Sequence, residues 1–210
     1  MFHVKHEGWG WRSAAIEALG LDLSGDQIAR LEAFEILVRD RAIPLGMVAG
    51  ADRDRLRERH IQDSLRAAAE ITNADRRAYD LGSGAGFPGV AVAVACPSLG
   101  VTLVESRRPR AAFLQLVLDR LELQNAAVSN VRVETLSEPV DVCLSRAFAR
   151  VGVAWQAAER ILLPHGRLIY FAGERFDPSD LPEGVAATLV RADLTSALAR
   201  AGPLVIMSRQ

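Results

Sequence analysis

Residues 78–96 read AYDLGSGAGFPGVAVAVAC, in which four glycines stand between two apolar segments. Residues 78–81 predict a strand. Residues 89–96 predict a helix despite their valines, because Pro88 suits the first turn of a helix. A glycine-rich connection lets another group approach the main chain more closely than side chains would allow. The segment therefore predicts a strand–loop–helix unit with a ligand at the loop.

Two ligand classes fit this loop. The stretch from Gly84 to Gly89 matches G-x-G-x-x-G of dinucleotide sites, but a lone match is weak and here it is displaced from the strand end. The stretch DLGSGAG instead places an acid before Gly82, Gly84 and Gly86, as the first motif of class I methyltransferases does. S-adenosylmethionine (AdoMet) has no pyrophosphate that needs a helix N-terminus. AdoMet therefore fits better than NAD.

Carboxylates follow two of the predicted strands. Asp80 lies beside the loop, where its charge suits the ammonium and sulfonium of AdoMet. Glu105 ends the strand predicted at 100–105, where a carboxylate can accept both ribose hydroxyls, a feature that NAD and AdoMet sites share. Ligands of open sheets lie outside the carboxyl ends of the strands. We therefore expect Asp80, Glu105 and the glycines Gly82, Gly84 and Gly86 at the cofactor.

Strands and helices alternate after residue 77. The expected strands are 78–81, 100–105, 126–134, 140–147, 166–173, 186–194 and 202–209, the last two an antiparallel pair. The expected helices between them are 89–96, 108–123 and 151–163, and 173–185 is the one long loop. This alternation predicts a mostly parallel seven-stranded sheet with helices on both faces. Because DLGSGAG resembles the first motif of class I methyltransferases, we expect an α/β fold of that (Rossmann-like) type.

The first 75 residues have a helical pattern instead. Ser24 and Gln27 form a capping-box sequence before a helix expected over 23–42, and a second long helix is expected over 52–71. We therefore expect an N-terminal helical extension, residues 1–75, and an AdoMet-binding core, residues 76–210, in one compact unit.

Composition limits the possible partners. The net charge is −1, so any contact with nucleic acid must come from a local patch of basic residues. Lys5 is the only lysine, so such a patch would consist of arginines, which suit phosphates. The two cysteines show no metal-ligand spacing, and no carboxylate–histidine cluster does either, so no metal is expected. No apolar leader or membrane-length run is present. We expect a soluble, cytoplasmic monomer.

Three segments occur together in one known family. RHIQDSL (59–65), DLGSGAGFPGVAVA (80–93) and SRAFA (145–149) follow the order of the RsmG (GidB) ribosomal RNA methyltransferases, which the chain resembles over residues 24–175. The resemblance implies AdoMet-dependent methylation of N7 of a single guanine, guanine 527, in the decoding-region loop of 16S rRNA. The implied partner is 16S rRNA or the small ribosomal subunit.

The resemblance also implies site residues. Cofactor contacts fall on Gly82 and Phe87 in the loop and on Val133 and Glu134 after the third strand. Arg146 matches the arginine of the family at the cofactor and substrate. The chain departs from the family at one position, because Ala172 stands where a lysine is common. Arg175 could supply that charge.

Further residues are candidates for the RNA substrate. Arg107 and Arg108, with Arg110, follow the second strand at the functional edge of the sheet. His60 and Asp63 in RHIQDSL form either a structural pair or a substrate contact. Four more arginines alternate along the second helix and spread around it, so a solvated helix is an equal alternative: Arg53, Arg55, Arg57 and Arg59.

The expected chemistry needs no general base, because guanine N7 carries a free lone pair. Catalysis then rests mainly on proximity and alignment, which can contribute about 7–11 kcal/mol. We expect Arg146 to hold a phosphate, the guanine O6 or the cofactor carboxylate. Three alternatives remain open: a methyltransferase for another RNA, a protein or a small molecule; an NAD-dependent oxidoreductase; and a binding module without activity.

Overall fold

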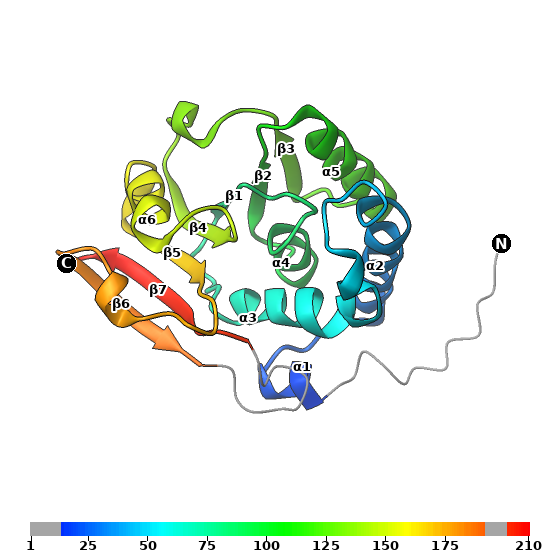
Figure 1. Cartoon of the computed structure of the whole chain (residues 1–210), viewed down its shortest axis with the longest axis horizontal. Coiled ribbons are helices and arrows are strands. Elements are labelled where there is room, and N and C mark those ends of the chain that lie inside the picture. The colour runs from blue at the N-terminus through cyan, green and yellow to red at the C-terminus, as the bar shows by residue number, and fades with distance from the viewer. Residues whose placement is uncertain (1–13, 192–200) are drawn as a thin grey trace.

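The computed structural model describes residues 14–191 and 201–210 and contains a seven-stranded sheet (Figure 1). The strand order is β3-β2-β1-β4-β5-β7-β6; β1 to β5 run parallel, and β7 pairs antiparallel with β5 and β6. The mostly parallel sheet is confirmed. The strands are β1 (Arg77–Leu81), β2 (Gly100–Val104), β3 (Ala126–Ser129), β4 (Val140–Arg146), β5 (Leu162–Phe171), β6 (Val185–Val190) and β7 (Leu204–Arg209).

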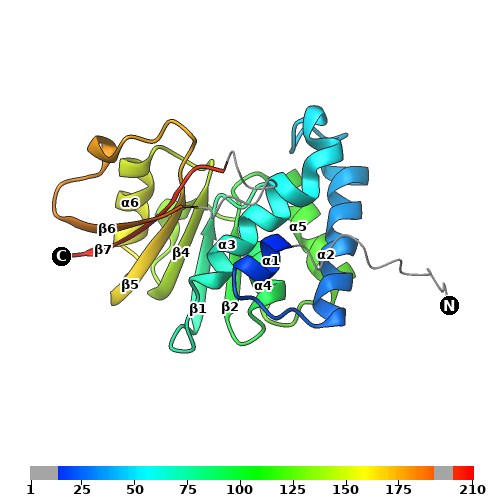
Figure 2. The ribbon, with the colours of Figure 1, turned by 90° about the horizontal axis from the view of Figure 1, so that it is seen from below.

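Helices cover both faces of the sheet, as Figure 2 shows edge-on. One face packs against α2 to α5 and the other against α6, because alternate residues of the central strands enter two separate apolar cores. The α-helices are α1 (Ala14–Ala18), α2 (Gly25–Leu37), α3 (Asp63–Ala69), α4 (Gly89–Ala95), α5 (Arg108–Leu121) and α6 (Val151–Glu159). Shorter helical segments are η1 (Val38–Ala42), η2 (Gly50–Arg55), η3 (Arg57–Gln62), η4 (Val133–Thr135) and η5 (Pro178–Asp180).

The N-terminal helices share the core of the sheet. Leu31 and Phe34 of α2 are fully buried in the same apolar cluster as Val90 of α4. The capping box at the start of α2 is present, with mutual hydrogen bonds between Ser24 and Gln27. The Gln27 side chain also donates to the carbonyl of Val94 at 2.8 Å, so this cap ties α2 to α4.

Several predicted elements have different bounds. The helix expected over 23–42 consists of α2, which ends at Leu37, and the π segment η1. The helix expected over 52–71 consists of a 3-10 segment, a π segment and α3. The strand expected over 126–134 ends at Ser129, and a 3-10 turn buries Val133. The helix expected over 151–163 ends at Glu159, because its apolar tail joins β5 instead. Residues 192–194 of the expected strand 186–194 lie outside the described residues.

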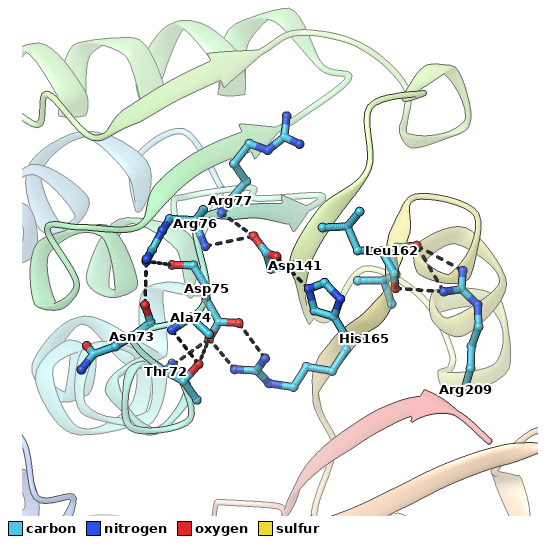
Figure 3. Close-up of polar contacts among 12 residues, drawn as sticks. Thr72, Asn73, Ala74, Asp75, Arg76, Arg77, Asp141, Leu162, His165 and Arg209 are labelled. Carbon is cyan, nitrogen blue, oxygen red and sulfur yellow. Dashed lines mark hydrogen bonds and ion pairs between the residues drawn. The ribbon is translucent and has the colours of Figure 1, made fainter.

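A polar network closes the amino edge of the sheet (Figure 3). The Arg167 guanidinium on β5 binds both carboxylate oxygens of Asp75 at 2.7 and 2.8 Å. Asp141 at β4 accepts hydrogen bonds from the main-chain N–H groups of Arg76 and Arg77, both at 2.9 Å. This network holds the residues just before β1 against Asp141 of β4 and Arg167 of β5.

The strand order reverses between β1 and β4, which are neighbours at the centre of the sheet. Such a switch point forms a crevice at the carboxyl ends of the strands, where open α/β sheets bind ligands. The glycine loop follows β1 there, and the SRAFA segment follows β4. Within the described ranges, no helix is long and apolar enough to cross a membrane.

Candidate cofactor and substrate site

The glycine loop depends on left-handed backbone conformations. Gly82, Gly84 and Gly86 have φ values of +72°, +57° and +99°. A Cβ atom at Gly82 would lie 2.6 Å from Cδ2 of Phe148, and one at Gly86 would lie 2.8 Å from Cγ2 of Val90. The sequence predicts that another group lies close to the main chain of these glycines. At Gly82 and Gly86 that group is a side chain of the protein itself, Phe148 and Val90 respectively. At Gly84 a Cβ atom would make only ordinary contacts, 3.8 Å from the carbonyl oxygen of Gly82 and 3.9 Å from Nη1 of Arg110.

Asp80 lies beneath the loop and is fully buried. Its Oδ2 accepts a hydrogen bond from the N–H of Gly89 at 3.1 Å, which fixes the start of α4. Its Oδ1 has no hydrogen-bond partner within the described part of the chain. Burial raises the pKa of the Asp80 carboxyl to about 7. Asp80 supports the loop from below, and a direct contact with the cofactor remains a prediction.

Glu105 connects the two chain segments at the ends of β1 and β2. Its Oε2 accepts a hydrogen bond from the N–H of Gly84 at 3.1 Å, and its Oε1 accepts one from the N–H of Arg107 at 2.8 Å. An ionised carboxylate has about four acceptor positions, so two remain for a ligand. The side chain is nearly buried but reaches the wall of a cavity.

This cavity, called here the cofactor cavity, has a volume of about 350 Å³, within the range of small-molecule sites. Six predicted residues line it: Gly82, Glu105, Arg107, Arg110, Val133 and Glu134. The SRAFA segment supplies Ala147 and Phe148 as a further wall. A nucleoside with a charged side chain fits this combination of carboxylates, open main chain and apolar surface. Five residues predicted at the cofactor are not among its lining residues: Asp80, Gly84, Gly86, Phe87 and Arg146. The substrate candidates Arg108, His60 and Asp63 are not among them either.

Arg146 at the end of β4 binds the N-terminal helices. Its Nη2 donates to the carbonyl of Arg59 at 2.9 Å, and its Nη1 donates to the carbonyl of His60 at 3.2 Å and to Oγ of Ser64 at 3.4 Å. Asp63 completes an ion pair at 3.5 Å. Both terminal nitrogens of Arg146 thus bind the end of η3 and the start of α3. Its contact with a phosphate, the guanine O6 or the cofactor carboxylate stays a prediction.

His60 joins this arrangement to the glycine loop. Its Nδ1 lies 3.2 Å from Nη2 of Arg146, which can only donate, so Nε2 carries the proton and donates to Oδ2 of Asp52 at 3.0 Å. The imidazole packs on Phe87 with 5.0 Å between ring centroids. Burial, then the positive charge of Arg146, lowers the pKa of His60, which keeps it neutral. The structural pairing of His60 is with Asp52, not with Asp63.

A second cavity, called here the substrate cavity, lies on the other side of the SRAFA segment and has a volume of about 750 Å³. Its polar residues include three arginines in addition to Arg146, and its carboxylates include Asp63. The charged lining residues are Arg55, Glu58, Arg59, Asp63, Arg146, Glu174 and Arg175. Ala172 and Arg175 both line this cavity, so the arginine stands close to the position where the family carries lysine.

Ala147 lines both the cofactor cavity and the substrate cavity. Its φ of +52° is unusual for a residue other than glycine, and such strain clusters at functional sites. Sequence reasoning did not select Ala147, because its backbone angle leaves no mark in the sequence beyond its place in SRAFA. The two cavities therefore meet at one strained residue beside the switch point of the sheet.

Solved structures share this fold. A mutant form of MtNAS in complex with S-adenosylmethionine has a TM-score of 0.56 at 15% identity, covering 88% of this chain and 72% of that one. A putative S-adenosylmethionine-dependent methyltransferase from Methanococcus maripaludis has a TM-score of 0.54 at 13% identity, covering 76% and 91%. The fold, with the glycine loop after its first central strand, is therefore the class I methyltransferase fold.

The chain belongs to the GidB family, rRNA small subunit methyltransferase G, whose model matches residues 27–180. It is 34% identical to ribosomal RNA small subunit methyltransferase G of Ralstonia nicotianae over 206 residues, which is 93% of this chain and 92% of that protein. The protein of the same name from Acidiphilium cryptum is 35% identical over 194 residues, covering 91% and 87%. Family membership decides against the NAD-dependent alternative.

Proposed function

We propose that this protein transfers the methyl group of AdoMet to N7 of one guanine of 16S rRNA, the decoding-loop guanine that the family resemblance implies. The observation that carries the proposal is the meeting of the cofactor cavity and the substrate cavity at Ala147. A methyl donor in one cavity then faces an acceptor base in the other across a single residue.

The cofactor cavity holds AdoMet in this proposal. Glu105 accepts the ribose hydroxyls on its two remaining acceptor positions. Val133 and Glu134 border the adenine, and Gly82 lies at the cavity wall. Gly84 and Gly86 keep the loop in the left-handed backbone conformations that place it there. Asp80 acts through the loop, because its carboxylate is fully buried beneath it. When bound, AdoMet supplies an electrophilic methyl group on its sulfonium.

The substrate cavity receives the guanine after it leaves its stack, as recognition of single RNA bases generally requires. Arg55 and Arg175 supply positive charge for the RNA backbone at its wall, where Arg59 is paired with Asp52. The carboxylates of Glu58 and Asp63 provide acceptors that match the N–H donors on the Watson–Crick edge of guanine. That edge points away from N7, so its recognition leaves N7 open toward the methyl group.

Arg146 acts as a positioning residue rather than a general acid or base. Guanine N7 needs no deprotonation, so the protein contributes mainly alignment, on the order of 7–11 kcal/mol. By binding the carbonyls of Arg59 and His60, Arg146 holds the η3 segment against Phe87 and the glycine loop. This contact joins the wall of the substrate cavity to that of the cofactor cavity. Arg107 and Arg108 then serve the outer RNA surface.

We further propose that a single chain suffices, because residues of one chain line both cavities. A cytoplasmic location follows from the substrate, since ribosomal subunits are assembled there. The division at residue 75 marks the start of the sheet, while the helices before it complete the core and the substrate cavity.

The test is methyl transfer from labelled AdoMet to small ribosomal subunits that lack the modification, followed by chemical cleavage at N7-methylguanine. A single new cleavage in the decoding-region loop is expected. Arg146→Ala should lose most of the transfer activity and keep its fold, as circular dichroism would show. Absence of transfer while calorimetry still shows AdoMet binding would overturn the substrate assignment and keep the cofactor assignment.

A further inference from the structure

We propose that a third cavity, on the far side of Tyr170, binds the nucleotide next to the target guanine. The proposal rests on the proposed function, because it assumes that the substrate cavity receives a base of single-stranded RNA. It adds a second subsite that reads a flanking nucleotide.

This flanking cavity has a volume of about 650 Å³. It lies between the start of α6 and the segment that joins β5 to β6, which run side by side in both ribbon views (Figures 1 and 2). It shares no lining residue with the cofactor cavity but shares Tyr170, Gly173 and Arg175 with the substrate cavity. A strand of RNA can therefore pass from one cavity to the other over these three residues.

Two arginines of the flanking cavity are available for phosphate. Arg150 and Arg175 are exposed, and neither guanidinium makes an ion pair or hydrogen bond with another residue in the ranges 14–191 and 201–210. In contrast, Arg57 and Arg59 are engaged with Glu35 and Asp52. Because guanidinium groups bind phosphate oxygens in a bidentate manner, the position of Arg175 in both cavities suits the phosphate between two nucleotides.

Two aromatic rings supply a surface for a base. Tyr170 and Phe176 line the cavity and are half-buried, so part of each ring is exposed. The hydroxyl of Tyr170 donates to the carbonyl of Ala149 at 3.0 Å, which orients its ring. Exposed aromatic rings beside arginines are the usual platform for single-stranded nucleic acid, since every base can stack on them.

The main chain of the cavity is also accessible. A Cβ atom added at Gly152 or at Gly173 would have no neighbour within 4 Å. Both glycines therefore border open space, in contrast to Gly82 and Gly86, whose surroundings are filled. Asp180 and Gln156 add an acceptor and an amide at the wall, and these can bind the edge of a base. Phosphate, stacking and base-edge groups together fit a nucleotide better than an apolar peptide.

The first experiment needs no variant. The probe is a short, fluorescently labelled, single-stranded oligoribonucleotide with one central guanine, and binding to the full-length protein is followed by anisotropy. A set of probes replaces each flanking nucleotide in turn by an abasic one. If the cavity holds a neighbouring base, one abasic position beside the guanine weakens binding about tenfold or more, the scale of one lost stacking contact. Equal binding of all the probes would overturn the proposal.

The second experiment fills the cavity. Gly152→Leu adds a side chain where open space exists and where φ is ordinary, so the fold is retained. Gly25→Leu is the matched control, because Gly25 also begins a helix, also has nothing within 4 Å and lines none of the three cavities. Gly152→Leu should weaken binding of the intact probe about tenfold, leave calorimetric AdoMet affinity unchanged and abolish the difference between intact and abasic probes.

The two proposals fail in distinguishable ways. If wild-type protein methylates small subunits but Gly152→Leu does so with unchanged kcat/KM, the flanking subsite is wrong and the proposed function stands. If wild-type protein methylates no ribosomal RNA yet the abasic scan shows one sensitive position, the subsite stands and the substrate assignment is wrong. Arg150→Ala provides a second variant, with an expected loss of RNA binding and no change in AdoMet binding.

Discussion

The glycines of residues 82–89 serve different purposes although they look alike in the sequence. Gly82, Gly84 and Gly86 are required by their positive φ values. Gly89 has an ordinary φ, but a Cβ there would lie 2.4 Å from Cδ2 of Leu103 and 2.6 Å from Oδ2 of Asp80. Gly89 thus keeps the start of α4 close to β1 and β2, where its N–H reaches Asp80.

Gly89→Ala should therefore destabilise the protein although alanine is the better helix former. Overpacking against Leu103 and Asp80 costs about 1–3 kcal/mol, which a lower midpoint in urea unfolding would show. Gly25→Ala, which adds the same methyl group in open space, should leave the midpoint nearly unchanged. Equal midpoints for the two variants would mean that Leu103 and Asp80 move aside at no cost.

Among the elements, η3 is held by residues from distant parts of the chain. A π-helical turn is rarely stable by itself and is common at functional sites. Here Arg146 binds its carbonyls, and His60 connects it to Phe87 and Asp52. The segment RHIQDSL therefore works together with SRAFA, although the bonded residues His60 and Arg146 are 86 positions apart in the chain.

Stability should depend on pH through His60. Its pKa is lowered in the folded protein by burial and by Arg146, so the unfolded chain binds the proton more tightly. The free energy of unfolding should then fall as pH drops below about 6.5, by at most about 1.4 kcal/mol for each unit of pKa difference. Urea unfolding of His60→Gln between about pH 7 and pH 5 should show a smaller pH dependence than the wild type.

The control for this experiment is His165→Gln, because His165 is 74% exposed and lies at the opposite edge of the sheet. This variant removes an imidazole that pairs with Asp141 and does not touch η3, so the difference between the wild type and His60→Gln should be absent from it. Hydrogen exchange of the η3 amides offers a second readout, with faster exchange at about pH 5 than expected from intrinsic rates alone. Identical pH profiles for wild type and His60→Gln would show that His60 does not titrate with folding.

At the scale of the whole molecule, the two edges of the sheet have separate roles. The amino edge carries the network around Asp75, Asp141 and Arg167 (Figure 3). The carboxyl edge carries the glycine loop, SRAFA and the cavities that they border. Mutations at the amino edge should therefore change stability and leave ligand binding intact.

Arg167→Ala tests this separation. Asp75 is only 5% exposed, and it loses both bonds to the guanidinium while keeping those to Thr72. The expected loss is about 1–3 kcal/mol in urea unfolding, with unchanged AdoMet affinity in calorimetry. Arg77→Ala is the control, because its ion pair with Glu138 is exposed and 3.7 Å long, so it should cost under about 1 kcal/mol. Weakened AdoMet binding in Arg167→Ala would contradict the separation.

Local sequence patterns were sufficient to predict the structure of a segment where contacts among its own residues determine that structure. The capping box at Ser24 and the strand–loop–helix unit around Gly82 were predicted from such patterns. The end of α6 was not predicted from such a pattern, because Leu162 belongs to β5. There Arg209 of β7 donates to the carbonyls of Leu162 and Leu163 at 3.2 and 2.9 Å. An apolar run of this length fits a helix or a strand equally well, so a distant residue decides.

The sequence by itself determined the sheet architecture, the strand–loop–helix unit around Gly82 and the family, because hydrophobic periodicity and contiguous motifs encode them. Only the tertiary structure decided what the polar groups do. Asp80 is buried beneath the loop, Arg146 binds the η3 carbonyls, and Ala147 separates two cavities. These roles depend on contacts between residues far apart in the chain, which the packing of β1, β4 and the N-terminal helices brings together.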